Sequence, residues 1–252
     1  MRSVTDDLAY SLDPVLWAKE VLGYHPDPWQ ADLLRSRSRK IILNCSRQSG
    51  KSTTCAALGL HESIYRRPSF GLVIAPSQDQ SAELMMKFDE FRGAVELPSD
   101  YLSTDTKLAV KFANGNRFVA RPGSEKTARS FSAVTLLLED EASRVLDDLY
   151  NTVRPMLAVS NGRHILMSTP FGKRGHFFKI WSEERDLWEW FEIPAEKCPR
   201  ISSEFLAEEK RTNPWFEQEY HCQFLETIDS VFTFDQVASA LTDEVEPLFG
   251  VG

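Results

Sequence analysis

The chain lacks long apolar runs, paired cysteines and repeated segments. None of its apolar runs approaches the ~20 residues that a helix needs to cross a bilayer, and the N-terminal sequence MRSVTDDLAY has no secretory apolar stretch. Its four cysteines, Cys45, Cys55, Cys198 and Cys222, form no CxxC pair and have no histidine at zinc-ligand spacing. We therefore expect a soluble intracellular protein whose thiols are reduced and buried.

Positive charge is also scarce. The 29 Lys and Arg residues are outnumbered by 37 Asp and Glu residues, which gives a formal net charge of −8. This balance argues against a chain whose whole surface binds nucleic acid, so any DNA contact would come from local basic clusters or from an assembled ring. The length of 252 residues, 42% of them hydrophobic, suits one domain with a full core and a small appended subdomain.

Short apolar runs alternate with helical stretches, which is typical of an α/β protein with a mostly parallel sheet. The predicted strands are residues 40–44, 71–76, 134–138 and 164–168. Alternating residues around Asn114 and Gly115 predict an antiparallel hairpin inserted at the edge of the sheet.

The pattern changes after Ser182. A possible strand at residues 188–193 is followed by amphipathic segments at 202–211 and 214–224, which predict a small helical lid. We therefore expect a core with an N-terminal helical segment at residues 1–181, a lid at 182–228 and a linker at 229–252.

The strongest chemical signal is CSRQSGKST at residues 45–53, which lies between an apolar run and a helix-competent stretch. This order of strand, loop and helix is the setting of a phosphate-binding loop. Backbone N–H groups around Ser49 and Gly50 can face phosphate oxygens, Lys51 can reach the β and γ phosphates, and Ser52 can bind Mg2+. The pattern predicts hydrolysis of a nucleoside triphosphate.

One position of this loop departs from the pattern GxxxxGK[ST], because Cys45 occupies the place of the first glycine. The alternative is a serine-rich helix start that contains Gly-Lys-Ser by chance. The predicted nucleotide-binding residues of the loop are Ser46, Arg47, Gln48, Ser49, Gly50, Lys51, Ser52 and Thr53.

A second signal is TLLLEDEAS at residues 135–143, where an apolar strand runs into Asp140 and Glu141. Sites of open α/β sheets form at this end of the strands. Asp140 would hold Mg2+, while Glu141 would polarise the attacking water. Glu139 leaves the register open by one residue, and the alternative is an acidic helix start favoured by the helix dipole.

Two shorter strings have a structural meaning beside the functional one. Ser168 and Thr169 would lie near the γ phosphate if their strand lay between the other two, although such a string commonly marks a turn. The string DPWQ makes a good helix start, and its functional interpretation has Gln30 hydrogen-bonding an adenine edge with Trp29 packed nearby.

Two arginines are candidates for stabilising the charge that develops during phosphoryl transfer. Arg47 lies inside the phosphate loop and would act in cis, while Arg129 lies in the TARS segment and would act in trans. Most arginines are instead solvated or ion-paired surface residues.

The ordered set DPWQ, CSRQSGKST, LVIAPSQDQ, TARS, LLLEDEAS and MSTPFGKRGHF resembles the ATPase domain of the large terminase subunit of tailed bacteriophages, over roughly residues 26–224. The resemblance implies a P-loop NTPase of the additional-strand, catalytic-glutamate type. It also implies Gln30 as the adenine reader, Lys51 and Ser52 as phosphate and Mg2+ ligands, and Asp140 with Glu141 as the Walker B pair. Ser168 and Thr169 would form the coupling motif, and Arg129 would be offered to a neighbouring subunit, although Ser130 follows it where the family often has glycine.

Such a protein would use ATP and Mg2+ to drive double-stranded DNA into a procapsid in the host cytoplasm. Its partners would be DNA, the portal protein, the small terminase subunit and further copies of itself in a ring, and a membrane would not be involved. The family also carries a C-terminal nuclease domain, for which no room would remain after Phe232, so we expect this chain to hydrolyse ATP without cutting DNA and the full protein to be considerably longer. Lys173, Arg174, Arg121 and Lys126 could line a DNA channel or be solvated charges.

Two other functions remain open. A helicase-like or chromatin-type translocase shares these motifs, but it usually needs a second motor domain. An ATP-gated assembly adaptor would bind nucleotide without turnover, and Cys45 would then mark a loop that does not hydrolyse.

Overall fold

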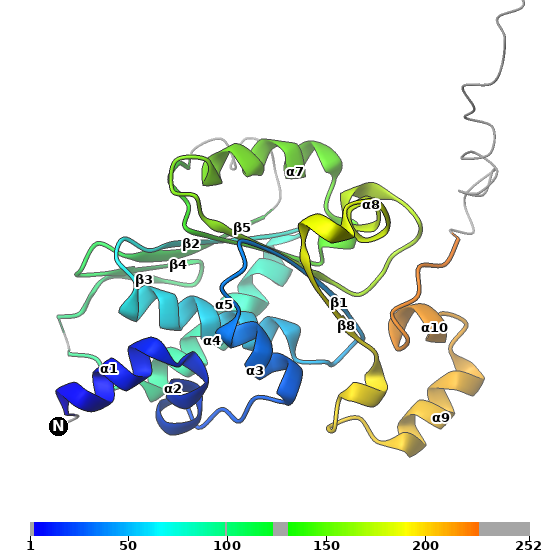
Figure 1. Ribbon diagram of the computed structural model, residues 1–252, viewed down its shortest axis with the longest axis horizontal. Helices are drawn as coiled ribbons and strands as arrows, with labels where there is room; N and C mark the ends of the chain where they lie inside the picture. The colour runs from blue at the N-terminus through cyan, green and yellow to red at the C-terminus, as the bar shows by residue number, and fades with distance from the viewer. Residues whose placement is uncertain (1–2, 99, 123–130, 227–252) are drawn as a thin grey trace, which may run out of the picture.

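A single eight-stranded sheet organises the chain, with strand order β3-β4-β5-β2-β6-β7-β1-β8 (Figure 1). The computed structural model describes residues 3–98, 100–122 and 131–226. The strands are β1 (Lys40–Cys45), β2 (Phe70–Ala75), β3 (Leu102–Thr106), β4 (Ala109–Phe112), β5 (Arg117–Pro122), β6 (Leu136–Asp140), β7 (Arg163–Ser168) and β8 (Glu189–Ile193). The six strands from β5 to β8 in this order run parallel, while β3 and β4 are antiparallel. The predicted mostly parallel α/β architecture is confirmed.

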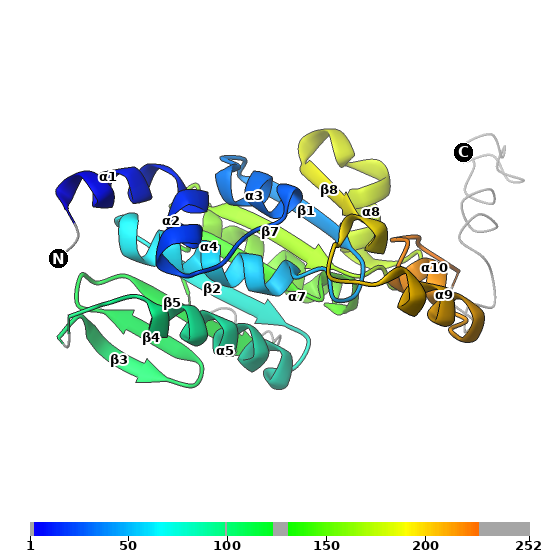
Figure 2. The same cartoon turned by 90° about the horizontal axis from the view of Figure 1, so that it is seen from below.

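Helices cover both faces of the sheet (Figures 1 and 2). The helices are α1 (Val4–Leu12), α2 (Pro14–Val21), α3 (Pro28–Arg35), α4 (Lys51–Tyr65), α5 (Gln78–Ala94), α7 (Asp147–Val153), α8 (Gly175–Glu183), α9 (Ser203–Thr212) and α10 (Phe216–Glu219). Helices α1 to α5 lie on one face, α7 and α8 lie on the other, and α9 and α10 lie beyond one end of the sheet. Among the helices that the structure describes, none combines the length and apolarity that crossing a membrane requires.

Successive side chains along each strand point to opposite faces of the sheet, so they pack alternately into the core on one face and on the other. Ile41 and Leu43 pack in the cluster under α3 and α4, whereas Ile42 between them packs with Phe177 of α8. All are fully buried, as expected for parallel strands covered on both faces. The same alternation governs β6, where Leu138 belongs to the first layer and Leu137 to the second.

The hairpin predicted around Gly115 is present as β4 and β5. Gly115 has a φ of 88°, which a residue without Cβ adopts at no steric cost. Strand β5 also pairs with β2 in parallel, so the hairpin widens the main sheet and places β3 at its edge.

The segment expected to form the lid, residues 182–228, is divided between the sheet and the lid. Strand β8 pairs in parallel with β1 along residues 41–45, so the sheet continues past residue 181. Helix α9 matches its prediction closely, but the second predicted lid helix is shorter, because α10 covers only Phe216–Glu219. Asn213 explains its late start, since the side-chain oxygen of Asn213 accepts a hydrogen bond from the Trp215 N–H before Phe216. The linker predicted at residues 229–252 lies outside the described residues.

Candidate functional site

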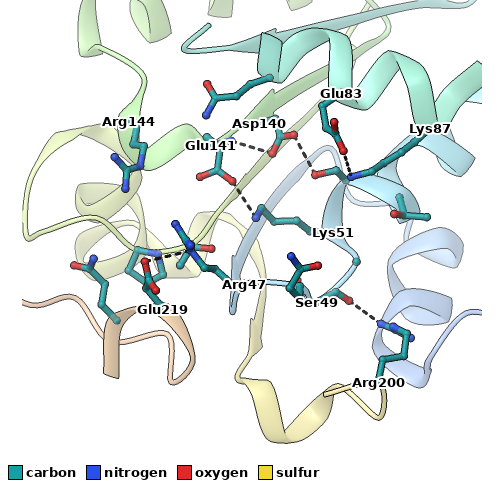
Figure 3. A pocket seen from close by; sticks show the side chains of 18 residues that line it. Arg47, Ser49, Lys51, Glu83, Lys87, Asp140, Glu141, Arg144, Arg200 and Glu219 are labelled. Atoms are coloured by element: carbon teal, nitrogen blue, oxygen red, sulfur yellow. Dashed lines mark hydrogen bonds and ion pairs between the residues drawn. The ribbon is translucent and has the colours of Figure 1, made fainter. Parts of the chain in front are cut away.

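A cavity of about 840 Å³ opens over the phosphate-binding loop, at the carboxyl ends of the parallel strands (Figure 3). The loop residues 47–53 form one wall, between β1 and α4. Gln48 and Gly50 have φ angles of 58° and 90°, and these left-handed residues turn the chain from the strand into the helix. Gly50 is the N-cap of α4. The N–H groups of the first turn of α4, which have no partner within the helix, therefore lie at the end of the helix that borders the cavity.

Cys45 does not disturb this loop. It is the last residue of β1, fully buried, and pairs with Ile193 of β8. Its backbone is therefore extended, and a glycine is not needed there. Burial raises the pKa of the Cys45 thiol to about 12, which keeps it neutral. All four cysteines are free and buried, as predicted.

Two pairs join the loop to the acidic end of β6. Lys51 Nζ lies 3.1 Å from Glu141 Oε1, and Ser52 Oγ donates to Asp140 Oδ2 at 3.1 Å. Burial works to lower the pKa of Lys51, but the carboxylates of Glu141 and Asp140 outweigh it and raise this pKa. Burial raises the pKa of Asp140, a carboxyl that also accepts the Glu141 N–H at 3.0 Å.

The ambiguity between Glu139 and Asp140 is resolved by the alternation of β6. Asp140 points toward α4 and the loop, where it contacts Ser52. Glu139 is fully buried on the opposite face of the sheet and contacts His176 and His164. Because adjacent strand residues face opposite sides, only one of the two carboxylates can reach the loop.

The structure shows the helix-cap role of Gln30 in DPWQ, whereas its contact with adenine stays a prediction, because Gln30 is buried and is not among the residues that line the cavity. Its side-chain oxygen accepts the Asp27 N–H at 2.9 Å, as a helix cap requires, and also the Tyr24 hydroxyl at 2.8 Å. Its amide nitrogen donates to the Ser49 carbonyl of the loop at 3.2 Å. Trp29 is buried in the core and does not line the cavity.

The end of β7 lies between β6 and β1, which is the position required for the predicted coupling motif. Thr169 lines the cavity. Ser168 is fully buried and instead bonds the Ser143 hydroxyl, with an oxygen separation of 2.7 Å. Ser46 is also fully buried and is not among the residues that line the cavity. Its N–H donates to the Ile193 carbonyl, which fixes the start of the loop against β8.

The two predicted arginines have different outcomes. Arg47 lines the cavity, and its guanidinium lies 3.2 Å from Glu219 Oε1 of α10. Arg47 N also donates to the Glu219 carbonyl, so the loop is tied to the lid at two points. Arg129 lies outside the described residues.

Several residues that line the cavity are not among those predicted from the sequence. Arg200 donates to the Ser49 carbonyl at 2.9 Å and contacts Asp27 at 2.8 Å. The others are Gln80, Glu83 and Lys87 of α5, Arg144 after β6, and Gln218 and Glu219 of α10. Gln80 ends the string LVIAPSQDQ, but no local pattern marks the others, because they reach the cavity through the packing of elements that lie outside the motifs.

Comparison with known proteins identifies the family. Residues 42–239 match the family described as "Terminase large subunit, T4likevirus-type, N-terminal". The terminase large subunits of Thermus phage G20c and Thermus virus P23-45 are 28% and 26% identical to the chain over 174 and 171 residues. Each alignment covers 61% of this chain and 35% of the relative, so the chain matches about a third of the length of these relatives.

Solved structures share the fold. The large terminase ATPase domain of Thermus phage P74-26 matches with a TM-score of 0.71 at 20% identity, covering 85% of this chain and 100% of that one. The large terminase of bacteriophage HK97 matches with a TM-score of 0.68 at 16% identity, covering 85% and 55%. With its fold shared by phage large terminases and most of its length matched by the family, the chain belongs to the T4-like-virus type of terminase large subunits, within their N-terminal region.

Proposed function

We propose that this chain is an Mg2+-dependent ATPase that powers the movement of double-stranded DNA into a viral procapsid. The observation that carries the proposal is the convergence of Lys51, Ser52, Asp140 and Glu141 on one cavity, from the phosphate loop and the neighbouring end of β6. These are the groups that phosphoryl transfer needs, a phosphate-binding lysine, oxygen ligands for a metal and a carboxylate for water.

The chain's own residues divide this work. The N–H groups at the start of α4 and the Lys51 ammonium bind the phosphates and offset their charge. Glu141 accepts a hydrogen bond from the attacking water and orients it toward the γ phosphate. Arg47 adds a guanidinium from the same loop, on the side of the cavity next to Glu219 of α10.

The residues present also fit a magnesium ion. Ser52 Oγ and Asp140 Oδ2 lie 3.1 Å apart, and a hydroxyl and a carboxylate are oxygen ligands of the type that Mg2+ prefers. Bound there, Mg2+ would neutralise negative charge on the phosphate oxygens. Ser52 and Asp140 would hold it.

Nucleotide binding is supported by relatives of the same fold. The large terminase of the thermophilic bacteriophage D6E has been solved in complex with ADP and with ATP-gamma-S. In the present chain Gln30 would read adenine, Trp29 would support it from the core, and Ser168 and Thr169 would respond to the γ phosphate.

A packaging role would bring further partners. DNA, a portal protein, a small terminase subunit and a ring of copies of this chain would assemble in the host cytoplasm. Arg129 would then reach the site of a neighbouring copy. Lys173, Arg174 and Arg121 are candidate DNA contacts in the described part of the chain, and Lys126 lies outside it.

The test is ATP hydrolysis by the purified chain over a wide range of protein concentrations, with Lys51→Ala and Arg129→Ala alongside. Turnover per subunit that rises with concentration and is lost in both variants supports a ring motor completed by its neighbour. Turnover that is independent of concentration and unaffected by Arg129→Ala would favour a helicase-like ATPase acting alone. Nucleotide binding without turnover at any concentration would favour the assembly adaptor.

A further inference from the structure

The catalytic candidate Glu141 sits in an uncommon backbone conformation. Its φ of 51° and ψ of 41° place it in the left-handed region, at the turn from β6 into the 3₁₀ helix Ala142–Arg144. Such a conformation in a residue with a Cβ is sparsely populated and persists where the surrounding structure enforces it. The groups that enforce it therefore determine where the Glu141 carboxylate points.

On the amino side of the turn, Glu139 provides an anchor on the far face of the sheet. Its carboxylate is fully buried and lies 2.6 Å from His176 Nε2 and 3.3 Å from His164 Nε2. His176 is held in turn, because its ring stacks on Tyr150 at 4.2 Å and its Nδ1 lies 3.1 Å from Asp147 Oδ1. A carboxylate is this deeply buried only when it is well paired, so the position of Glu139 depends on these contacts.

On the carboxyl side of the turn, Ser143 provides a second anchor. Its N–H donates to Ser168 Oγ at 3.2 Å, and the two hydroxyl oxygens lie 2.7 Å apart. The Ser143 hydroxyl also donates to the Thr169 carbonyl at 2.8 Å. Ser143 thus makes its contacts with the end of β7 and the residue that follows it.

The partners of both anchors belong to one segment of the chain, residues 168–176. Ser168 and Thr169, which contact Ser143, are its first two residues, and His176, which contacts Glu139, is its last residue and lies in the first turn of α8. The same stretch lines the nucleotide cavity through Thr169 and Pro170. Glu141 lies midway in sequence between Glu139 and Ser143, so the turn that carries it is fastened on both sides to one segment that faces the nucleotide.

We propose that the pairs Glu139–His176 and Ser143–Ser168 are positioning devices that hold Glu141 in register with residues 168–176. This proposal rests on the proposed ATPase function and assigns the alignment of the catalytic carboxylate to groups outside the cavity. A shift of residues 168–176 when the γ phosphate binds or leaves is then transmitted to Glu141 through two short connections. Glu139 and His176 are not among the residues that line the cavity, so they act only through the turn.

A purely structural role would have a different signature. A buried ion pair can often be replaced by apolar residues of similar volume without loss of stability. The double variant Glu139→Leu/His176→Leu removes the first anchor while keeping the layer filled. Ser143→Ala weakens the second anchor without disturbing that layer, because it removes both hydroxyl contacts and leaves only the Ser143 N–H bond to Ser168 Oγ. His176→Gln keeps a side-chain donor for Glu139 and serves as the conservative rescue.

The first experiment is hydrogen exchange at the backbone amides of residues 143–145, measured by mass spectrometry or NMR without nucleotide. Both anchor variants should raise exchange there at least tenfold, with wild-type-like exchange in β1 and a smaller change in His176→Gln. Unchanged exchange at these amides in both variants would overturn the proposal. Because this measurement needs no turnover, it decides the positioning role even if the wild-type chain proves inactive, an outcome that would sink the proposed function alone.

The second experiment separates turnover from binding. In both anchor variants kcat should fall at least tenfold, while the dissociation constant for ATP stays within twofold of wild type. The control is His61→Gln, which removes another buried histidine. His61 belongs to α4, on the other face of the sheet, and its Nε2 lies 2.9 Å from the Tyr10 carbonyl oxygen. If His61→Gln lowers kcat as much as the anchor variants do, or if ATP affinity falls in parallel with kcat, the positioning role is wrong.

Discussion

The Lys51 ammonium and the Glu141 carboxylate lie 3.1 Å apart across the nucleotide cavity, so the phosphate-binding cation and the predicted catalytic base are paired with each other (Figure 3). Both side chains are largely shielded, with exposed fractions of 11% and 24%, which strengthens the attraction relative to a surface pair. In the proposed function, an incoming γ phosphate would compete with Glu141 for Lys51. Binding of the nucleotide would then free the Glu141 carboxylate to bind the attacking water.

This pairing predicts opposite outcomes for its two partners. Glu141→Gln should lower kcat by about 10²- to 10⁴-fold, because an amide cannot act as the base, while ATP affinity is kept or slightly improved. Lys51→Ala should weaken ATP binding by about tenfold to a hundredfold, through loss of a hydrogen bond to a charged group. Equilibrium binding of a fluorescent ATP analogue and steady-state turnover measure the two effects. Equal loss of affinity in both variants would contradict this division.

Arg200 should be required for tight nucleotide binding although it belongs to the lid segment. Its guanidinium donates to the Ser49 carbonyl, which restrains the peptide between Ser49 and Gly50 in the phosphate loop, and it also contacts Asp27. Arg200→Ala should weaken ATP affinity by roughly threefold to tenfold, the equivalent of about one net hydrogen bond. Arg200→Lys should restore little, because one ammonium does not reproduce the fork.

Lys197→Ala is the matched control for Arg200, because Lys197 donates to the Glu192 carbonyl nearby and does not line the cavity. Titration of each variant with the same nucleotide decides the matter. An Arg200→Ala protein that binds ATP as tightly as Lys197→Ala does would remove Arg200 from the site.

Phe118 makes Gly71 irreplaceable for packing. A Cβ built on Gly71 would collide with the Phe118 ring, and one on Gly59 would lie 2.5 Å from the same ring. The ring cannot move freely, because it is fully buried and stacks on Phe88 at 4.3 Å. Gly71→Ala should therefore lower the free energy of unfolding by about 1–3 kcal/mol, as measured by chemical denaturation.

Gly93 provides the contrasting case. A Cβ there meets nothing within 4 Å, and the residue lies in α5. Gly93→Ala should raise the free energy of unfolding by about 0.5–1 kcal/mol, because alanine loses less backbone entropy in a helix. The steric explanation fails if both alanine variants change stability in the same direction.

His221 should make the stability of the lid depend on pH. Burial acts to lower the pKa of His221, but hydrogen bonds with Glu217 and Glu196 outweigh it and raise this pKa above the ordinary 6.5. The folded chain then binds the proton more tightly than the unfolded chain, so the stabilisation is complete below pH 6.5 and is lost as the pH rises through the raised pKa.

The difference in Tm between wild type and His221→Gln should accordingly be larger at about pH 5.5 than at about pH 9. Thermal denaturation at the two pH values measures it, and the comparison with the variant cancels the titration of all other groups. A difference that is the same at both pH values, or larger at high pH, would contradict the assignment of a charged His221.

The local motifs were readable from the sequence because their chemistry is contained in a few consecutive residues. The phosphate loop occupies nine successive positions, and a strand before it and a helix after it are enough to orient its N–H groups and Lys51. The acidic run at the end of β6 was readable for the same reason, since parallel strands deliver their carboxyl ends to one edge. The parallel sheet followed from the alternation of apolar runs and helices.

Tertiary structure decided what depends on pairing and on distant elements. Asp140 could be preferred to Glu139 only once it was known which side chains of β6 point toward α4. The sequence does not determine this, because three acidic residues follow one another. The place of β8 beside β1 and the reach of Arg200 to Ser49 depend on contacts between segments about 150 residues apart, which carry no local signal. The sequence by itself determined which chemistry the chain carries, because short-range order is sufficient for a phosphate loop. Only the fold decided which side chains aim and support that chemistry, because long-range packing sets their directions.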